Sequence, residues 1–410
     1  MGSALTVCHA CDALQQRPPI EGYGKALCYR CGALLYRGFP QAYRVTLALQ
    51  LTALLLFILM ATFPFITLEL KGSREETYLL SAAAIFFNYG MGGVGLVVAA
   101  TTLVIPLLVT ITTLLLLVVS AQARALRLLA LLVRFQRFLA PWSMVAVFAL
   151  GVMVTLIKLQ QSATLIPGVA FWALLALLPV LALAQLSLAA IALWPAVAAP
   201  SGVSAAAVTA HQAGLCHCAL CDNLAVAATA ASHCPRCGSR WRSEHSRQST
   251  VLALLITGTL LLIPANIYPI MSVYNFGRGQ PDTILSGIIK LIEAHMWGLA
   301  VVIFIASILV PWLKLLTLYG LLYSTLHRGG WRPRERALLH RITEAVGVWS
   351  MTDIFIVALM AALVNLGTVA TIAPGPGAIY FCAAVMVTML AAAAFDTRTF
   401  WRDVEKSKTC

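Results

Sequence analysis

The segment Cys28-Tyr-Arg-Cys-Gly32 returns 206 residues later as Cys234-Pro-Arg-Cys-Gly238, and each copy precedes long apolar stretches. Other residues recur at nearly the same spacing, namely Pro64 and Pro269, Gly93 and Gly298, Pro106 and Pro311, and Trp142 and Trp349. Solenoid units recur every ~20–50 residues, so a period this long indicates a duplicated domain. The chain is therefore predicted to consist of two related halves.

The composition is that of an integral membrane protein. Sixty per cent of the 410 residues are hydrophobic, 10% are charged, and the mean hydropathy is +0.88, values outside the range of soluble globular proteins. About 20 apolar residues suffice for a helix to cross the ~30 Å hydrocarbon core. Spans are expected at about 45–68, 94–120, 139–161, 167–194, 250–272, 297–323, 346–368 and 376–395.

The net charge of +13 indicates topology and not a nucleic-acid partner. Of the 28 Lys and Arg residues, 22 lie at the termini and in alternate connections, whereas loops 69–80 and 273–293 carry few. The positive-inside rule therefore places both termini and both cysteine clusters in the cytoplasm. We expect a multi-pass protein of the bacterial inner membrane, with these two loops periplasmic and its basic face attracted to anionic lipid.

Each half begins with two Cys-x2-Cys motifs. Such a pair can place four thiolates at the corners of a tetrahedron, the geometry that zinc prefers. Disulfides are the alternative, but they are rare in the reducing cytoplasm. Two structural zinc ions are expected, with no open coordination position and no catalytic role. The predicted ligands are Cys8, Cys11, Cys28, Cys31, Cys218, Cys221, Cys234 and Cys237.

The predicted fold class is an all-α integral membrane protein with two tandem repeats, each a small zinc ribbon followed by a four-helix transmembrane bundle. The second ribbon is expected to pack on its own bundle. The expected domains are ribbon 1 at 1–44, bundle 1 at 45–195, a linker at 196–215, ribbon 2 at 216–247, bundle 2 at 248–396 and a basic tail at 397–410.

Ionisable residues inside the spans point to a working site, because one at the bilayer centre costs ~2.5–3.5 kcal/mol on insertion scales. Lys314 and Asp353 fall at similar depth and could pair. Their equivalents in the first half are Val109 and Ala146, so the scaffold does not need the charges. A proton-linked switch is one interpretation, and a structural ion pair is the other. The candidate polar core is Ser307, Lys314, Ser350, Asp353 and Thr388.

Several stretches resemble the paraquat-inducible protein A family of bacterial inner-membrane proteins. They are Cys-Pro-Arg-Cys-Gly at 234–238, Pro-Ala-Asn-Ile-Tyr-Pro-Ile at 264–270, Trp-Ser-Met-Thr-Asp-Ile-Phe at 349–355, Pro-Gly-Pro-Gly-Ala at 374–378 and Phe-Asp-Thr-Arg at 395–398. The first half departs from this pattern, since it lacks equivalents of Asn266 and Asp353.

The resemblance implies that the protein passes lipids between the inner membrane and a tunnel formed by a periplasmic MCE-domain partner. No nucleotide-binding loop is present, so coupling to protons through Lys314 and Asp353 is a hypothesis. An enzyme is not expected, and no catalytic residues are assigned. Two alternatives remain: a membrane anchor or assembly factor for an MCE partner without transport activity, and a membrane oxidoreductase that uses the Cys-x2-Cys thiols.

Overall fold

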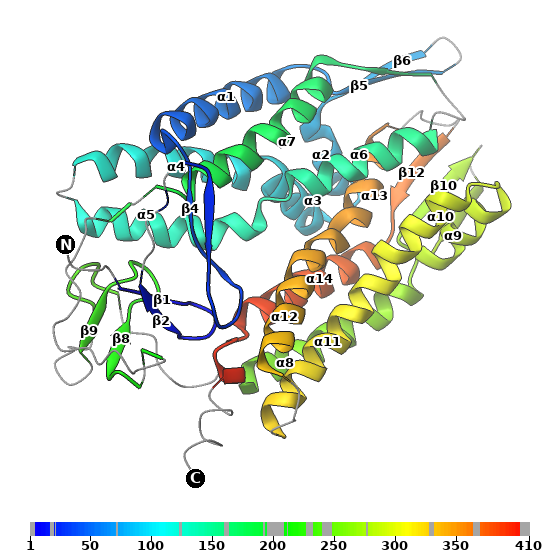
Figure 1. Cartoon of the computed structure of the whole chain (residues 1–410). Coiled ribbons are helices and arrows are strands. Elements are labelled where there is room, and N and C mark those ends of the chain that lie inside the picture. Colours follow the sequence, from blue (N-terminus) through cyan, green and yellow to red (C-terminus); the bar gives the residue numbers. More distant parts are fainter. Residues whose placement is uncertain are drawn as a thin grey trace.

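The computed structural model describes residues 5–16, 20, 22–70, 73–122, 125–159, 164–191, 193–194, 209–210, 212–226, 233–239, 248–275, 278–327, 332–363 and 370–401. Two helical bundles lie side by side, with the cysteine ribbons at one end and short β-sheets at the other (Figure 1). These ends are called the ribbon side and the sheet side below. The predicted linker 196–215 and tail 397–410 fall largely outside the described residues.

Eight helices in the described part of the chain are long and apolar enough to cross a membrane, which confirms the predicted helical fold. In the first half they are α1 (Ala42–Thr62), α3 (Gly92–Ala99) continuing through η1 (Ala100–Val104) into α4 (Ile105–Gln122), α5 (Leu126–Leu139) continuing through η2 (Ala140–Trp142) into α6 (Val145–Leu159), and α7 (Val169–Leu188). In the second they are α8 (Gln248–Ile267), α10 (Trp297–Phe304) with η4 (Ile305–Leu309) and α11 (Val310–Leu326), α12 (Pro333–Gly347) with η5 (Val348–Met351) and α13 (Thr352–Leu363), and α14 (Gly377–Ala394).

The third span of each half begins earlier than hydropathy predicts. α5 and α12 are amphipathic extensions on the ribbon side, joined to α6 and α13 by the 3-10 turns η2 and η5. Arg134 and Arg341 occupy equivalent positions on these extensions. Such basic residues end a continuous apolar run, although the helix itself continues because one of its faces is still buried.

Each second span contains a π-helical turn just before a proline. η1 and η4 end directly before α4 and α11, and the second residue of each helix is a proline, Pro106 or Pro311. Proline has no N–H to donate to the preceding turn, and a single wide turn relieves the clash with that turn. The turn η4 carries Ser307, so this irregularity positions one member of the predicted polar core.

The loops on the sheet side form a three-stranded antiparallel sheet in each half. The first has the order β6 (Ser73–Thr77), β5 (Ile66–Leu70), β7 (Thr164–Pro167), and the second has the order β11 (Arg278–Asp282), β10 (Met271–Asn275), β12 (Ala370–Pro374). Short helices follow, α2 (Leu79–Asn88) and α9 (Ile284–Glu293). A Cβ at Gly168 or Gly375 would collide with the carbonyl of Pro64 or Pro269, so each strand-to-helix corner requires glycine.

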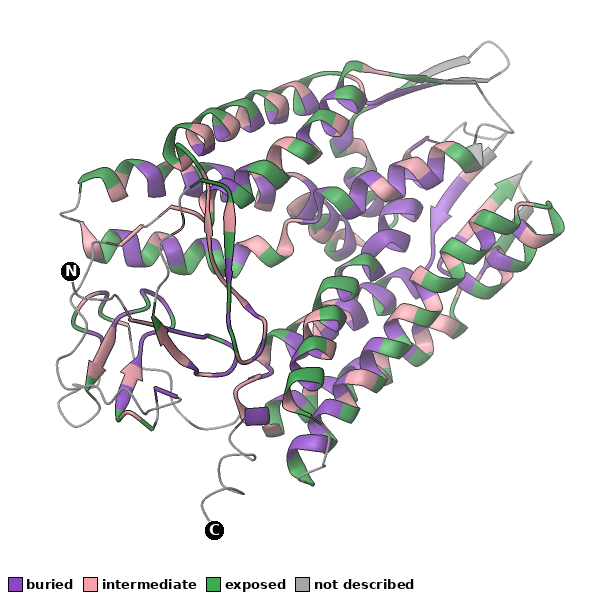
Figure 2. Cartoon of the chain, viewed as in Figure 1, coloured by how far each residue is buried: buried purple, intermediate pink, exposed green. Residues whose placement is uncertain are grey.

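The helix α13 lies between the two halves, and almost all its residues are buried (Figure 2). It packs against α6 and α2 of the first half. Gly151 of α6 allows close approach, since a Cβ there would lie 3.0 Å from Phe355 Cβ. The rings of Phe148 and Phe355 meet edge to face at 5.6 Å. Asp353, in the first turn of α13, therefore lies at the junction of the two bundles.

Candidate functional site

The four Cys-x2-Cys motifs fold into the same tight turn. In each, the amide of the residue after the second cysteine donates to the carbonyl of the first cysteine, at 2.9–3.0 Å. That following residue has a left-handed backbone, with φ between 54° and 69°, which glycine and aspartate tolerate better than most residues. The four residues at this position are Asp12, Gly32, Asp222 and Gly238.

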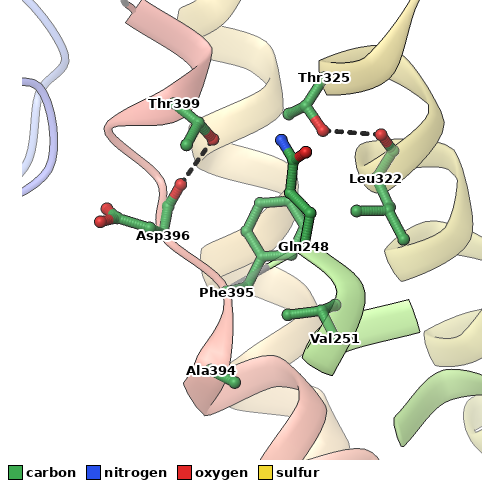
Figure 3. A pocket seen from close by; sticks show the side chains of 8 residues that line it. All are labelled: Gln248, Val251, Leu322, Thr325, Ala394, Phe395, Asp396 and Thr399. Atoms are coloured by element: carbon green, nitrogen blue, oxygen red, sulfur yellow. Dashed lines mark hydrogen bonds between the residues drawn. The ribbon is translucent and has the colours of Figure 1, made fainter. Parts of the chain in front are cut away.

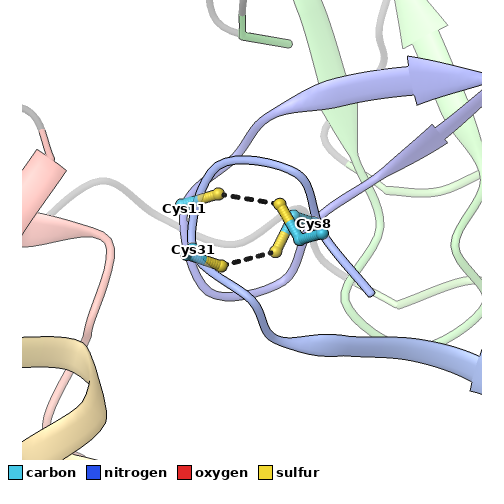
Figure 4. A group of neighbouring side chains, drawn as sticks. Cys8, Cys11 and Cys31 are labelled. Atoms are coloured by element: carbon cyan, nitrogen blue, oxygen red, sulfur yellow. Dashed lines mark hydrogen bonds between the residues drawn. The ribbon is translucent and has the colours of Figure 1, made fainter. Parts of the chain in front are cut away.

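Each set of four sulfurs is preorganised for a metal ion. The four Sγ atoms of a set all lie within 4.8 Å of one another. The Sγ atoms of Cys8 and Cys31 are 3.5 Å apart, and so are those of Cys11 and Cys28. Figure 4 shows the first set, with Cys8, Cys11 and Cys31 labelled. A tetrahedral site with Zn–S bonds of ~2.3 Å has sulfurs about 3.8 Å apart, close to these values. Hydrogen bonds from Cys11 and then Cys8 lower the pKa of Cys31 to about 2, so a thiolate is already favoured.

Ribbon 1 docks on the second bundle. Arg341 of α12 donates through Nη2 to the Cys31 carbonyl at 3.0 Å. The guanidinium of Arg30 donates to the Cys11 carbonyl and lies 4.7 Å from the centre of the Trp401 ring, beyond the end of α14. The first ribbon is thus attached to helices that follow it in sequence by some 300 residues.

Ribbon 2 docks on the first bundle, so the prediction that it packs on its own bundle is wrong. Its cysteines join a buried cluster with Leu116 of α4 and Leu129 and Val133 of α5. Arg236 repeats the Arg30 arrangement, donating to the Cys221 carbonyl and stacking 5.5 Å from the centre of the Trp194 ring. Because the bundles are homologous, either one offers a similar surface to either ribbon, and sequence repetition alone does not select the pairing.

The five residues of the predicted polar core are all buried, but they do not form a single network. Lys314 and Asp353, which could have paired at their similar depth, make no ion pair within 4.0 Å in the described part of the chain. A Cβ on Gly347 would lie 2.7 Å from Lys314 Nζ, which shows that the ammonium packs against α12. Glu344 of α12 is the acidic group whose charge acts on Lys314.

Asp353 faces Ser307 instead. Among the described residues, no hydrogen-bond partner reaches Asp353 Oδ2, Ser307 Oγ or Ser350 Oγ, although all three atoms are buried. Unpartnered buried polar groups are rare in folded proteins. The cluster Asp353, Ser307 and Ser350 is therefore a place where water, a proton or a ligand group would gain hydrogen bonds.

Thr388 is engaged within its own helix and against α8. Its hydroxyl donates to the Val385 carbonyl at 3.0 Å within α14. Its methyl group lies against Gly258 of α8, where a Cβ would come within 2.8 Å. Thr388 thus serves the close packing of α14 on α8, and its depth in the span did not reveal which way it points.

The first bundle has buried polar residues that a search for charges misses. Gln50 of α1 is fully buried, and within the described chain neither its amide nitrogen nor its oxygen has a partner. Thr46 donates to Ser187 at 2.8 Å, and Gln136 donates to Thr113 at 3.0 Å. The sequence signal that could have revealed these residues was Gln50, a glutamine in the middle of an otherwise apolar span.

A small pocket on the ribbon side, between α8, α11 and the end of α14, is lined by Gln248, Thr325 and Asp396 among others (Figure 3). Its volume of about 10 Å³ leaves room for roughly one water molecule. Thr325 and Thr399 donate to nearby backbone carbonyls. This pocket is too small for a lipid.

The fold and sites define a class of protein: a polytopic membrane protein of two repeats, each with a four-cysteine metal module, and with charged residues buried in the second repeat. The family model for paraquat-inducible protein A matches residues 43–198 and 248–405, and the chain belongs to this family.

Curated relatives are similar over nearly their whole length. "Intermembrane transport protein PqiA" of Escherichia coli (strain K12) is 33% identical over 96% of this chain and 95% of that protein. "Lipophilic envelope-spanning tunnel protein A" of the same strain is 31% identical over 96% and 90%. "Probable intermembrane transport protein" of Haemophilus influenzae is 29% identical over 98% and 96%. No solved structure matches the chain significantly.

Proposed function

We propose that the protein transports phospholipid between the inner and outer membranes, passing it to or from a periplasmic MCE-domain tunnel. The names of the relatives, which refer to intermembrane transport and to an envelope-spanning tunnel, support this function. The domain division expected from the sequence fits the proposal, with two zinc ribbons in the cytoplasm and two bundles in the inner membrane. The protein is proposed to be a transporter and not an enzyme.

The observation that carries the proposal is the carboxylate of Asp353, which is buried where the two bundles meet and whose Oδ2 has no hydrogen-bond partner in the described structure. A buried charge without a partner destabilises a fold, and the first repeat has Ala146 at the equivalent position. A group that changes its charge at this junction would alter how α13 packs against α6 and α2. Proton binding at Asp353 and Lys314 is therefore proposed to drive the relative movement of the bundles.

The transport proposal is tested by lipid crosslinking in cells. A photo-reactive amino acid in place of Ser350, which is buried one helical turn before Asp353, is expected to crosslink phospholipid. The same amino acid in place of Glu335, exposed at the start of α12, provides the control for contact with bulk lipid or solvent. Crosslinks to protein alone at position 350 would contradict lipid transport through this region.

An assembly factor is the second candidate, and the lipid-exposed surface is compatible with a simple anchor. The assembly-factor interpretation predicts that neutral variants of Lys314 and Asp353 keep their function.

A membrane oxidoreductase finds less support, because all eight motif cysteines are buried in two closed sets of four. A reactive thiol requires exposure as well as a low pKa.

The proposed orientation predicts opposite labelling of two exposed glutamates. Glu293→Cys, at the end of α9 on the sheet side, is expected to react with an impermeant thiol reagent added to intact spheroplasts. Glu335→Cys, on α12, is expected to react only in inside-out vesicles. Labelling of Glu335→Cys in spheroplasts, with protection of Glu293→Cys, would reverse the topology.

A further inference from the structure

A cavity of about 540 Å³ lies on the ribbon side, where both ribbons meet both bundles. Basic side chains on its walls come from each of these parts: His9, Arg137, His217, His340, Arg341 and Arg398. The acidic side chains on its walls are Asp222, Glu344 and Asp396. Since a water molecule occupies ~30 Å³ of liquid volume, a polar cavity of this size holds many waters.

One face of α12 leads from this cavity to Lys314. His340, Arg341 and Glu344 line the cavity from adjacent turns of that face. Gly347 follows Glu344 by three residues, about 4.5 Å along the helix axis, and its missing side chain leaves the space that the Lys314 ammonium occupies. The cavity wall and the buried lysine are thus one helical turn apart.

The charges at this point are complementary. Lys314 is 4% exposed and lacks an ion pair within the described residues, whereas Glu344 is exposed and acts on it electrostatically. An alanine at position 347 would push its Cβ against Nζ and Cε of Lys314. The side chain of Lys314 is therefore held against the face of α12 that also carries Glu344, one helical turn away.

We propose that the cavity is the cytoplasmic vestibule of the Lys314 site and that Glu344 is the residue through which Lys314 exchanges protons with it. The proposal rests on the proposed function and identifies its cytoplasmic entrance. A proton from cavity water adds to the Glu344 carboxylate. The resulting carboxylic acid gives that proton, through a bridging water of the cavity, to the neutral amine of Lys314, which leaves a carboxylate and an ammonium ion. The ribbons form the outer wall, through His9 of ribbon 1 and His217 and Asp222 of ribbon 2.

Access to the vestibule can be measured without any transport assay. Glu344→Cys is placed in full-length protein in which Cys216, Cys382 and Cys410 are serine and the eight motif cysteines are retained. It is expected to react with an impermeant thiol reagent in inside-out vesicles and to be protected in spheroplasts. Trp297→Cys, exposed at the sheet-side start of α10, is the opposite control. No reaction of Glu344→Cys from either side, in protein with both metals bound, would overturn the vestibule.

The role of Glu344 is tested by measuring envelope function in Glu344 variants. Glu344→Gln is expected to lower envelope function about tenfold or more, since loss of one interaction with a charged group has roughly this effect, while Glu344→Asp restores most of it. Substitution of an exposed helix residue should leave folding and metal content intact. Wild-type function in Glu344→Gln would overturn its role. Should Glu344→Cys be labelled as expected while Asp353→Asn is fully active, the proposed proton-coupled transport fails and the vestibule stands.

Discussion

Replacing Asp353 with asparagine is expected to abolish envelope function without lowering the stability of the protein. Asp353 is 7% exposed, and in the described structure its Oδ2 has no hydrogen-bond partner. Asparagine keeps nearly the same shape and removes the charge, and a buried neutral amide costs less to desolvate than a buried carboxylate. Complementation of a strain that lacks the gene measures function, and the thermal unfolding midpoint of the purified protein measures stability.

The separation of Lys314 from Asp353 makes the double variant informative. Two charges that are not directly paired have separate roles, so Lys314→Met/Asp353→Leu is expected to fold and to be inactive. Lys290 provides a control outside the polar core: its half-exposed side chain contacts the buried Asp282 through Nζ and Oδ1 at 2.6 Å. Ser286 Oγ also donates to Asp282 Oδ1, at 3.2 Å, so the carboxylate keeps a partner and Lys290→Met is expected to remain active. A folded, fully active Asp353→Asn or double variant would show that the buried charges are only structural.

Replacing Cys28 with serine is expected to remove one of two bound zinc ions and to unfold ribbon 1. A closed four-thiolate zinc site supplies ~10–16 kcal/mol of binding free energy, which in a module this small is most of its folding free energy. Elemental analysis of the purified protein should fall from two zinc ions per chain to one. Cys216→Ser is the matched control, because Cys216 lies beside the second set and outside it, and it should retain both ions.

Ribbon 1 docks on the second bundle and ribbon 2 on the first, and this crossed arrangement determines which bundle is affected when a ribbon unfolds. Loss of ribbon 1 removes the contact between Arg341 and the Cys31 carbonyl, so Cys28→Ser is expected to speed hydrogen exchange in α12. Cys234→Ser removes the cluster on Leu129 and Val133, so exchange should rise in α5. Faster exchange in α5 for Cys28→Ser would contradict the crossed arrangement. A metal content near zero in the wild type, with all thiols titratable, would contradict zinc binding itself.

The sequence by itself determined the features that depend on residues close together in the chain. The eight spans follow from the apolarity of continuous segments, and the two metal sets follow from Cys-x2-Cys spacing, which closes the same hydrogen-bonded turn each time. The 206-residue recurrence established the duplication. Position along each helix was also predictable, because the rise per helical residue is fixed, and both Lys314 and Asp353 are buried in the structure.

Direction and partner choice required the tertiary structure. Depth along a helix does not give its rotation, and so Lys314 faces Gly347, Asp353 faces Ser307, and Thr388 packs on Gly258. Strand pairing on the sheet side joins β5 to β7 and β10 to β12 across about 100 residues, and local apolarity carries no signal for such distant pairing. The docking of each ribbon on the other bundle was undetermined for the same reason: two homologous surfaces are alike locally, and only packing of the whole chain selects between them.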